Sequence, residues 1–114
     1  MKIDKSLISG STTMLVLMLL NEGDKYGYEM IKKLEERSDN TFILKEGTLY
    51  PILHGLEKDG MVESYMHETE NGRKRRYYRI TLKGQKLLTD KKNEWDFFTS
   101  KINKVLGGEG HAMV

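Results

Sequence analysis

The Asn-Gly pair at positions 71 and 72 constrains the fold of this chain more than any other feature. Asn-Gly between two strand-like runs is the strongest short-range signal for a β-hairpin. Residues 61–68 and 75–81, on either side of the pair, contain the aromatic and β-branched residues that are typical of strands. The other apolar segments have the spacing of helices, so the sequence predicts a mainly α fold with one small β-hairpin.

The first helix is expected over residues 6–21, which lack the alternation of a strand. It carries two apolar stripes, one formed by Leu7, Gly10, Met14 and Leu17, the other by Ile8, Leu15, Val16, Leu19 and Leu20. A helix that is apolar around most of its circumference is buried around most of it. A domain of this size can cover one stripe, so the second stripe predicts a partner.

The second helix is expected over residues 25–37, where the apolar residues again recur at helical spacing. Asp24 precedes it and is a good N-cap residue. The predicted inner face contains Tyr28, Ile31 and Leu34. The polar residues that follow favour a turn before the next helix.

The third helix contains the only proline of the chain, Pro51. If Thr48 caps this helix, Pro51 is its third residue, where the missing N–H costs no intrahelical hydrogen bond. A start near Lys45 with a bend at the proline is the alternative. The helix is expected to end at Gly60, with an inner face formed by Leu49, Ile52, Leu53 and Leu56.

The last helix is expected over residues 82–106, capped by Thr81. A helix of about 25 residues is about 37 Å long, which exceeds the diameter of a small domain. Its distal half therefore needs a partner for a seam formed by Trp95, Phe98, Ile102 and Val105. The order of elements predicts a winged helix-turn-helix domain over residues 1–81, a C-terminal dimerisation helix over residues 82–106 and a disordered tail over residues 107–114.

The predicted hairpin is also the most basic part of the chain. Residues 71–84 hold six of the 19 lysines and arginines and none of the 17 acidic residues, which leaves 13 basic and 17 acidic residues, a net charge of −4, elsewhere. In a winged helix-turn-helix the third helix enters the DNA major groove and the wing reaches the backbone or the minor groove. The predicted wing contacts are Arg73, Lys74, Arg75 and Arg76.

Tyr50 is the predicted contact on the third helix, because it lies off the apolar face and its hydroxyl can donate to a phosphate. A buried tyrosine with a satisfied hydroxyl is the alternative for this residue. For the whole chain, the alternative to a DNA-binding regulator is a winged-helix module that binds an acidic protein or RNA through the basic hairpin, without an effector.

The sequence argues against an enzyme. It lacks the serine, zinc and phosphate-loop motifs of common enzyme classes, and His54, His67 and His111 do not have the spacing of metal ligands. No metal site and no cofactor are predicted, and there is no cysteine. The longest apolar run, residues 14–20, is too short to cross a bilayer, and no signal peptide is recognised. The expected location is the cytoplasm, without a membrane contact.

Three motifs resemble the PadR family of bacterial transcription regulators: "LNEGDKYGYEM", "EGTLYPILHGLEKDGMV" and "RRYYRITLKG". The resemblance implies a homodimeric repressor on a near-palindromic operator in double-stranded DNA, with the last helix packed against the partner. The positions carried over are Thr48, Tyr50 and the wing basic residues, with Tyr26 as a phosphate contact. Where many relatives have a basic residue this chain has Gly55, so one contact is missing or shifts to His54.

The segment "NEWDFF" resembles the multidrug-sensing members of that family. The resemblance implies that Trp95 lines a flat cavity at the dimer centre and stacks on a planar aromatic effector, with the first helix as the facing wall. The implied effector contacts are Leu7, Gly10, Met14, Leu17, Trp95, Phe98 and Thr99. The alternative is that these residues are simply the core of a dimer.

Overall fold

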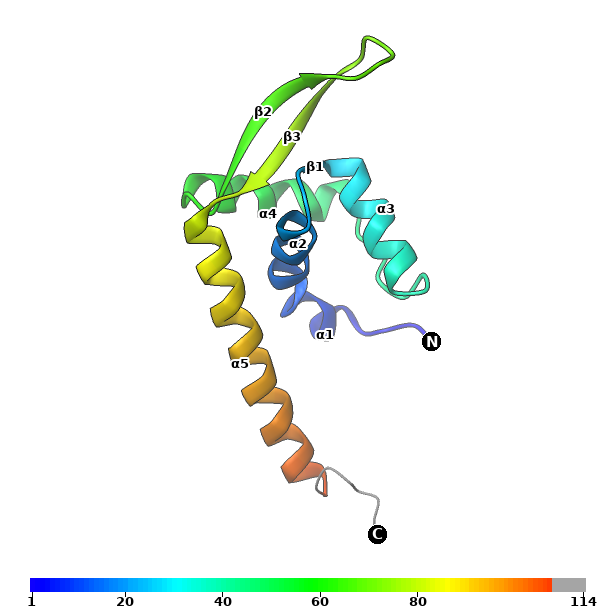
Figure 1. Ribbon diagram of the computed structural model, residues 1–114. Coiled ribbons are helices and arrows are strands. Elements are labelled where there is room, and N and C mark those ends of the chain that lie inside the picture. Colours follow the sequence, from blue (N-terminus) through cyan, green and yellow to red (C-terminus); the bar gives the residue numbers. More distant parts are fainter. Residues whose placement is uncertain (108–114) are drawn as a thin grey trace.

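The computed structural model describes residues 1–107, so the predicted tail lies outside the described residues apart from Gly107. In this part of the chain there are five helices and three strands (Figure 1): α1 Lys5–Ser9, α2 Thr12–Asn21, β1 Lys25–Tyr26, α3 Gly27–Arg37, α4 Glu46–Lys58, β2 Val62–Glu68, β3 Lys74–Ile80 and α5 Leu82–Leu106. The prediction of a mainly α fold with a small hairpin and a long last helix is confirmed.

The hydrophobic core lies where α2, α3 and α4 meet the base of the sheet. Its most deeply buried side chains are Val16, Leu17, Leu20, Met30, Leu49 and Leu53. Burying a large aliphatic side chain stabilises the fold by about 1.5–3 kcal/mol. The predicted inner face of the third helix is confirmed, because Leu49, Leu53 and Leu56 are buried and Ile52 packs against them.

The sheet has the order β1-β3-β2 and is antiparallel throughout. The hairpin of β2 and β3 is the predicted one, and its turn contains Gly72 in the left-handed region, with φ of 76°. The turn is closed by a hydrogen bond from the Thr69 N–H to the Arg73 carbonyl, at 2.8 Å. The short strand β1, which pairs with the middle of β3, was not predicted from the sequence.

The prediction of a single first helix is wrong, because the structure has two helices, α1 and α2, with a break at Gly10 and Ser11. The hydroxyls of Ser11 and Thr12 donate to the Ile8 carbonyl, at 2.9 and 3.0 Å. Such side-chain donors compete with the backbone donors that would continue a helix, and the Ser11 N–H donates to the same carbonyl at 2.9 Å. Gly10 adds to the effect, since glycine is a poor helix former.

The second helix begins two residues later than predicted, at Gly27, and Asp24 is not its cap. The N–H of Tyr26 donates instead to the Glu29 carboxylate, at 3.1 Å. The preceding residue, Lys25, is buried, and its ammonium donates to the Leu19 carbonyl at the end of α2, at 2.8 Å. The prediction of an inward Tyr28 is wrong, because this side chain is 54% exposed.

The third helix starts at the earlier of the two predicted positions. Its N-cap is Lys45, whose carbonyl accepts from the N–H groups of Thr48 and Leu49, at 3.0 and 2.9 Å, so Thr48 is not the cap. Pro51 is then the sixth residue of α4 and leaves the Gly47 carbonyl without a helical donor. Gly47 is exposed, so water can satisfy this carbonyl.

The long helix α5 matches its predicted range, and the Thr81 hydroxyl accepts from the Gly84 N–H at its start, at 3.0 Å. A Cβ at Gly84 would lie 2.1 Å from the Met61 carbonyl oxygen, so a glycine is needed where α5 crosses the base of the wing. From there α5 runs past α2 and away from the wing (Figure 1). No helix among residues 1–107 is both long and apolar enough to span a membrane.

Candidate nucleic-acid interface and interhelical cavity

Helix α4 presents a polar side to solvent because its apolar residues are used by the core. Thr48, His54 and Gly55 are exposed, and Tyr50 is 41% exposed. Three of the predicted DNA contacts, Thr48, Tyr50 and His54, therefore come from the accessible part of one helix. Their hydroxyl and imidazole groups can hydrogen-bond to phosphates or base edges.

The position of Tyr50 depends on a glycine in another helix. A Cβ at Gly27 would lie 2.3 Å from the Tyr50 hydroxyl oxygen and 2.8 Å from the ring carbon that bears it. Tyr50 therefore lies with its hydroxyl end against the start of α3, where any side chain at position 27 would displace it. Gly27 is not among the residues predicted from the sequence, where its only signal is its place inside the motif "KYGYEM".

The wing has one face toward α4, and Arg76 lies on it. The Arg76 guanidinium donates to the Ser64 hydroxyl at 3.0 Å, and this hydroxyl donates to Glu57 of α4 at 2.6 Å. Lys74, two residues earlier in β3, is exposed on the same face, since side chains alternate along a strand. Arg73 is exposed in the turn.

The opposite face of the wing carries a row of aromatic rings. Tyr77 packs edge-on against Tyr26, with ring centroids 5.4 Å apart, and stacks on Tyr65 at 5.8 Å. The Tyr65 hydroxyl donates to Asp24 at 2.6 Å, which raises the pKa of this phenol. Arg79 lies over the Tyr65 ring and pairs with Asp24 at 3.3 Å. These contacts tie the wing to the segment between α2 and α3.

Two predicted DNA contacts belong to this aromatic face. The guanidinium carbon of Arg75 lies 4.4 Å from the centroid of the Tyr26 ring, so each of these side chains already has a partner. The structure thus separates the eight predicted residues into α4 residues, basic residues of the turn and the α4-facing side, and this Arg75–Tyr26 pair. Asp24 and Tyr65 are not among the predicted site residues, because only the folded sheet brings them together.

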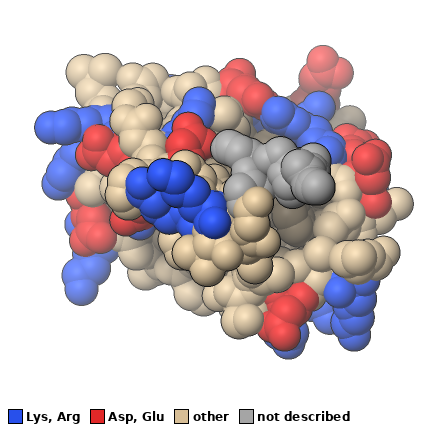
Figure 2. Space-filling view, turned by 90° about the horizontal axis from the view of Figure 1, so that it is seen from below, with Lys and Arg blue, Asp and Glu red and all other residues tan. Residues whose placement is uncertain are grey.

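The end of the molecule opposite the wing has a different surface. Seen from below, lysines and arginines alternate with aspartates and glutamates around its edge, and no single sign of charge predominates (Figure 2). The concentration of positive charge found in residues 71–84 lies at the other end, on the wing. A nucleic acid is therefore expected at the wing end.

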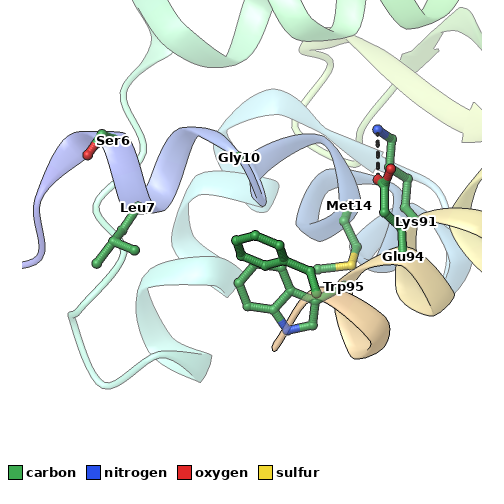
Figure 3. Close-up of a pocket in the computed structure, with 8 residues that line it drawn as sticks. Ser6, Leu7, Gly10, Met14, Lys91, Glu94 and Trp95 are labelled. Atoms are coloured by element: carbon green, nitrogen blue, oxygen red, sulfur yellow. Dashed lines mark ion pairs between the residues drawn. The ribbon is translucent and has the colours of Figure 1, made fainter. Parts of the chain in front are cut away.

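A cavity of about 370 Å³ lies between α1, the start of α2 and the middle of α5. Five of the predicted effector contacts line it: Leu7, Gly10, Met14, Trp95 and Phe98. The Met14 side chain reaches toward the indole of Trp95, as Figure 3 shows, and the rings of Trp95 and Phe98 lie 6.2 Å apart. The volume is within the range of small-molecule sites, about 300–1,000 Å³.

Two of the predicted effector contacts lie elsewhere. Leu17 is fully buried in the core, and the Thr99 hydroxyl donates to the Trp95 carbonyl of its own helix, at 2.9 Å. The cavity has polar lining residues that the sequence analysis missed: Ser6, Lys91 and Glu94. The Lys91 ammonium pairs with Glu94 at 3.6 Å, so this part of the wall has no net charge (Figure 3).

The sequence profile described as "Transcriptional regulator PadR-like family" matches residues 16–90, more than half of the chain. The chain is 38% identical over 77 residues to the transcriptional regulator Rv3488 of Mycobacterium tuberculosis, covering 68% of each protein. It superposes with a TM-score of 0.80 on a transcriptional regulator from Clostridium thermocellum, at 40% identity, covering 87% of this chain and 96% of the other. For a PadR-like transcriptional regulator from Bacillus cereus the TM-score is 0.78 at 30% identity, covering 91% and 99%.

Proposed function

The chain belongs to the PadR-like family of transcriptional regulators, and on this premise we propose that it is a homodimeric repressor released by a planar aromatic effector. Membership of the family makes the chain a DNA-binding transcriptional regulator rather than an enzyme. The proposal adds the oligomeric state, the sign of regulation and the ligand. Because its target is chromosomal DNA, we also propose that it works in the cytoplasm.

The single observation that carries the proposal is an exposed apolar seam along distal α5, which adjoins the cavity around Trp95. Its members are Trp95, Phe98, Ile102 and Val105, which are between 38% and 85% exposed. Monomeric proteins rarely leave a contiguous apolar surface of this kind uncovered. A second copy of α5 would bury the seam, and the Trp95 cavity would then lie beside the interface.

A dimer explains how the chain reads a near-palindromic operator. Two α4 helices related by twofold symmetry must enter successive major grooves about 34 Å apart. In our proposal Thr48, Tyr50 and His54 approach the groove, and Arg73, Lys74 and Arg76 contact the backbone nearby. Tyr26 and Arg75 contribute to DNA binding indirectly, by stabilising the wing, since the Arg75 guanidinium packs on the Tyr26 ring on the face of the wing opposite α4.

An effector in the Trp95 cavity can act only if it binds the DNA-competent and the released forms with different affinity. Both walls of the cavity belong to elements that set the geometry of a dimer, α1 and α2 on one side and α5 on the other. A planar ring stacked on the indole changes the angle between the two α5 helices and so the spacing of the two α4 helices. Stacking on an aromatic side chain contributes about 1 kcal/mol beyond the burial of the ring.

The test uses Trp95, the only tryptophan, as a fluorescent reporter. Planar phenols are titrated into the protein while its emission is followed, and DNA retardation on the promoter region of its own gene is repeated at saturation. Saturable quenching together with a loss of retardation supports the proposal. Quenching without an effect on DNA binding contradicts the role of the ligand, and retardation that is insensitive to both salt and sequence contradicts operator binding.

A further inference from the structure

The turn of the wing contains a pair of residues that can react with each other. Asn71 is followed directly by Gly72, and glycine has no Cβ to shield its backbone nitrogen from the preceding side-chain amide. Larger residues follow the other four asparagines of the chain, which are Asn21, Asn40, Asn93 and Asn103. Position 71 is therefore where an asparagine side chain has the freest access to the next backbone nitrogen.

The structure leaves this pair open to solvent. The turn lies at the far end of the wing, away from the helices (Figure 1). Asn71 and Gly72 are both exposed, and a Cβ built on Gly72 would have no heavy atom within 4 Å. Within residues 1–107, the side-chain hydrogen bond of this loop is made by Thr69, whose hydroxyl donates to the Arg73 carbonyl at 3.2 Å, and not by Asn71.

A single backbone hydrogen bond restrains the nitrogen that would react. The Gly72 N–H donates to the Thr69 carbonyl at 2.9 Å, so the turn must open before this nitrogen is free. Opening of an exposed loop tip requires much less free energy than global unfolding. The folded protein can therefore react without unfolding, and a ligand that holds the wing closed should slow the reaction.

Positive charge beside the pair favours the reaction. The Gly72 nitrogen must lose its proton before it attacks, and nearby cations stabilise the anion that forms. Arg73 and Lys74 follow directly, are exposed and form no ion pair within residues 1–107. Residues 70–74 contain these two cations and one acid, Glu70, so the segment keeps a net charge of +1.

We propose that Asn71 is a site of spontaneous deamidation. The deprotonated Gly72 nitrogen attacks the side-chain carbonyl carbon of Asn71, a cyclic imide forms, and the side-chain nitrogen takes a proton from water and leaves as ammonia. Water then opens the imide. Cleavage at the side-chain carbonyl gives aspartate, and cleavage at the main-chain carbonyl gives isoaspartate, in which the backbone runs through the former side chain. The net reaction consumes water, releases ammonia and involves no oxidation.

Deamidation weakens DNA binding by the wing. Either product places a carboxylate beside Arg73 and Lys74, where it repels phosphates and competes with them for the two cations. Isoaspartate also lengthens the backbone of the loop, which the hydrogen bond from the Thr69 N–H to the Arg73 carbonyl closes at 2.8 Å. This consequence rests on the proposed function, whereas the reaction in the free protein does not.

The reaction is tested on the full chain without DNA, incubated at mildly alkaline pH and analysed by peptide mass spectrometry. The peptide that contains Asn71 is expected to change from amide to acid, with isoaspartate among the products and a rate that rises with pH. Asn40 is an exposed loop residue before threonine, and Asn93 and Asn103 are exposed on α5, so these three serve as internal controls and should keep their amides. Deamidation of Asn71 no faster than theirs, or without isoaspartate, overturns the proposal.

Three variants test the effect on DNA binding. Asn71→Gln keeps the amide but closes the larger imide ring far more slowly, so it should keep its mass and its affinity during incubation. Asn71→Asp reproduces one product and should weaken retardation of DNA from its own promoter region about two- to fivefold, a typical effect of one exposed charge interaction. Asn93→Asp adds the same charge on α5 and should bind normally. Equal affinities of Asn71→Asp and Asn93→Asp overturn the effect on DNA, and equal deamidation at position 71 with and without saturating DNA contradicts the requirement for an open turn.

Discussion

The winged-helix body, residues 1–81, and the distal half of α5 differ in where their large apolar side chains lie. In the body, Leu17, Met30, Leu49 and Leu53 are fully buried, and Lys25 is the only charged residue among the described ones that is buried with them. Along distal α5 the large apolar side chains are the exposed ones, including Phe97, Val105 and Leu106. We therefore expect the body to be stabilised by its own core, to which Leu88 of α5 contributes, and the distal helix to need another molecule to cover its apolar surface. Folding and DNA contact are expected to depend on the first region, and assembly on the second.

The largest effect is expected in the core of the body. Leu53→Ala removes a fully buried side chain and should lower the free energy of unfolding by about 2–5 kcal/mol. Leu82→Ala makes the same chemical change at an 84% exposed position outside the seam and should stay within about 0.5 kcal/mol. Denaturant titration of both variants measures the difference. Similar destabilisation by the two changes would show that the body does not carry the stability.

The second effect concerns assembly and should leave the fold intact. Ile102→Lys places a charge in the proposed interface and should convert the dimer to a monomer in sedimentation, with the helical circular dichroism retained. Asn93→Lys adds the same charge on the other side of α5, away from the Trp95 seam, and should remain dimeric. A native chain that sediments as a monomer, or an Ile102→Lys variant that stays dimeric, contradicts the interface.

The third effect distinguishes the two faces of the wing. Replacing Arg73 and Arg76 together by alanine should reduce the slope of log affinity against log salt by about 1.8, because each phosphate that an arginine neutralises contributes about 0.9. Arg75→Ala should change this slope less, because the Arg75 guanidinium lies over the Tyr26 ring. Retardation assays over a salt series measure both. A larger slope change for Arg75→Ala would place the DNA on the aromatic face.

The smallest effect is expected for a single hydroxyl on α4. Tyr50→Phe should weaken operator binding by about 1 kcal/mol, the net contribution of one hydrogen bond, without loss of stability. Gly27→Ala keeps the Tyr50 hydroxyl but forces the ring to move, since the new Cβ would lie 2.3 Å from the hydroxyl oxygen. It should weaken binding at least as much. Lower stability with unchanged affinity in Tyr50→Phe would identify a structural tyrosine.

Much of the fold could be predicted because it depends on local pattern. The Asn-Gly turn, the range of α5 with its Thr81 cap and the inner face of α4 all follow from residues close together in the chain. The start of α3 could not be predicted in the same way. There β1 pairs with Tyr77 and Tyr78 of the distant β3 and takes two residues from the expected helix.

The candidate site was only partly predictable for the same reason. The residue types of α4 and the wing indicate DNA contact, because tyrosine and arginine in these positions suit phosphates. Only the tertiary structure assigns Arg76 to the α4 side and Arg75 to the aromatic face, through contacts with Ser64 and Tyr26.

The apolar stripe on the first helix shows most clearly what the sequence by itself determined and what it did not. Its spacing established that Met14 and Leu17 share one helical face. The tertiary structure decided that Leu17 enters the core while Met14 lines the cavity with Trp95. The physical reason is that α5 packs against α2. This contact joins segments that are far apart in the sequence, so helical periodicity cannot predict which residues of α2 it covers. The same holds at the start of α5, where only the folded chain brings Gly84 so close to the Met61 carbonyl that a Cβ would lie 2.1 Å from its oxygen.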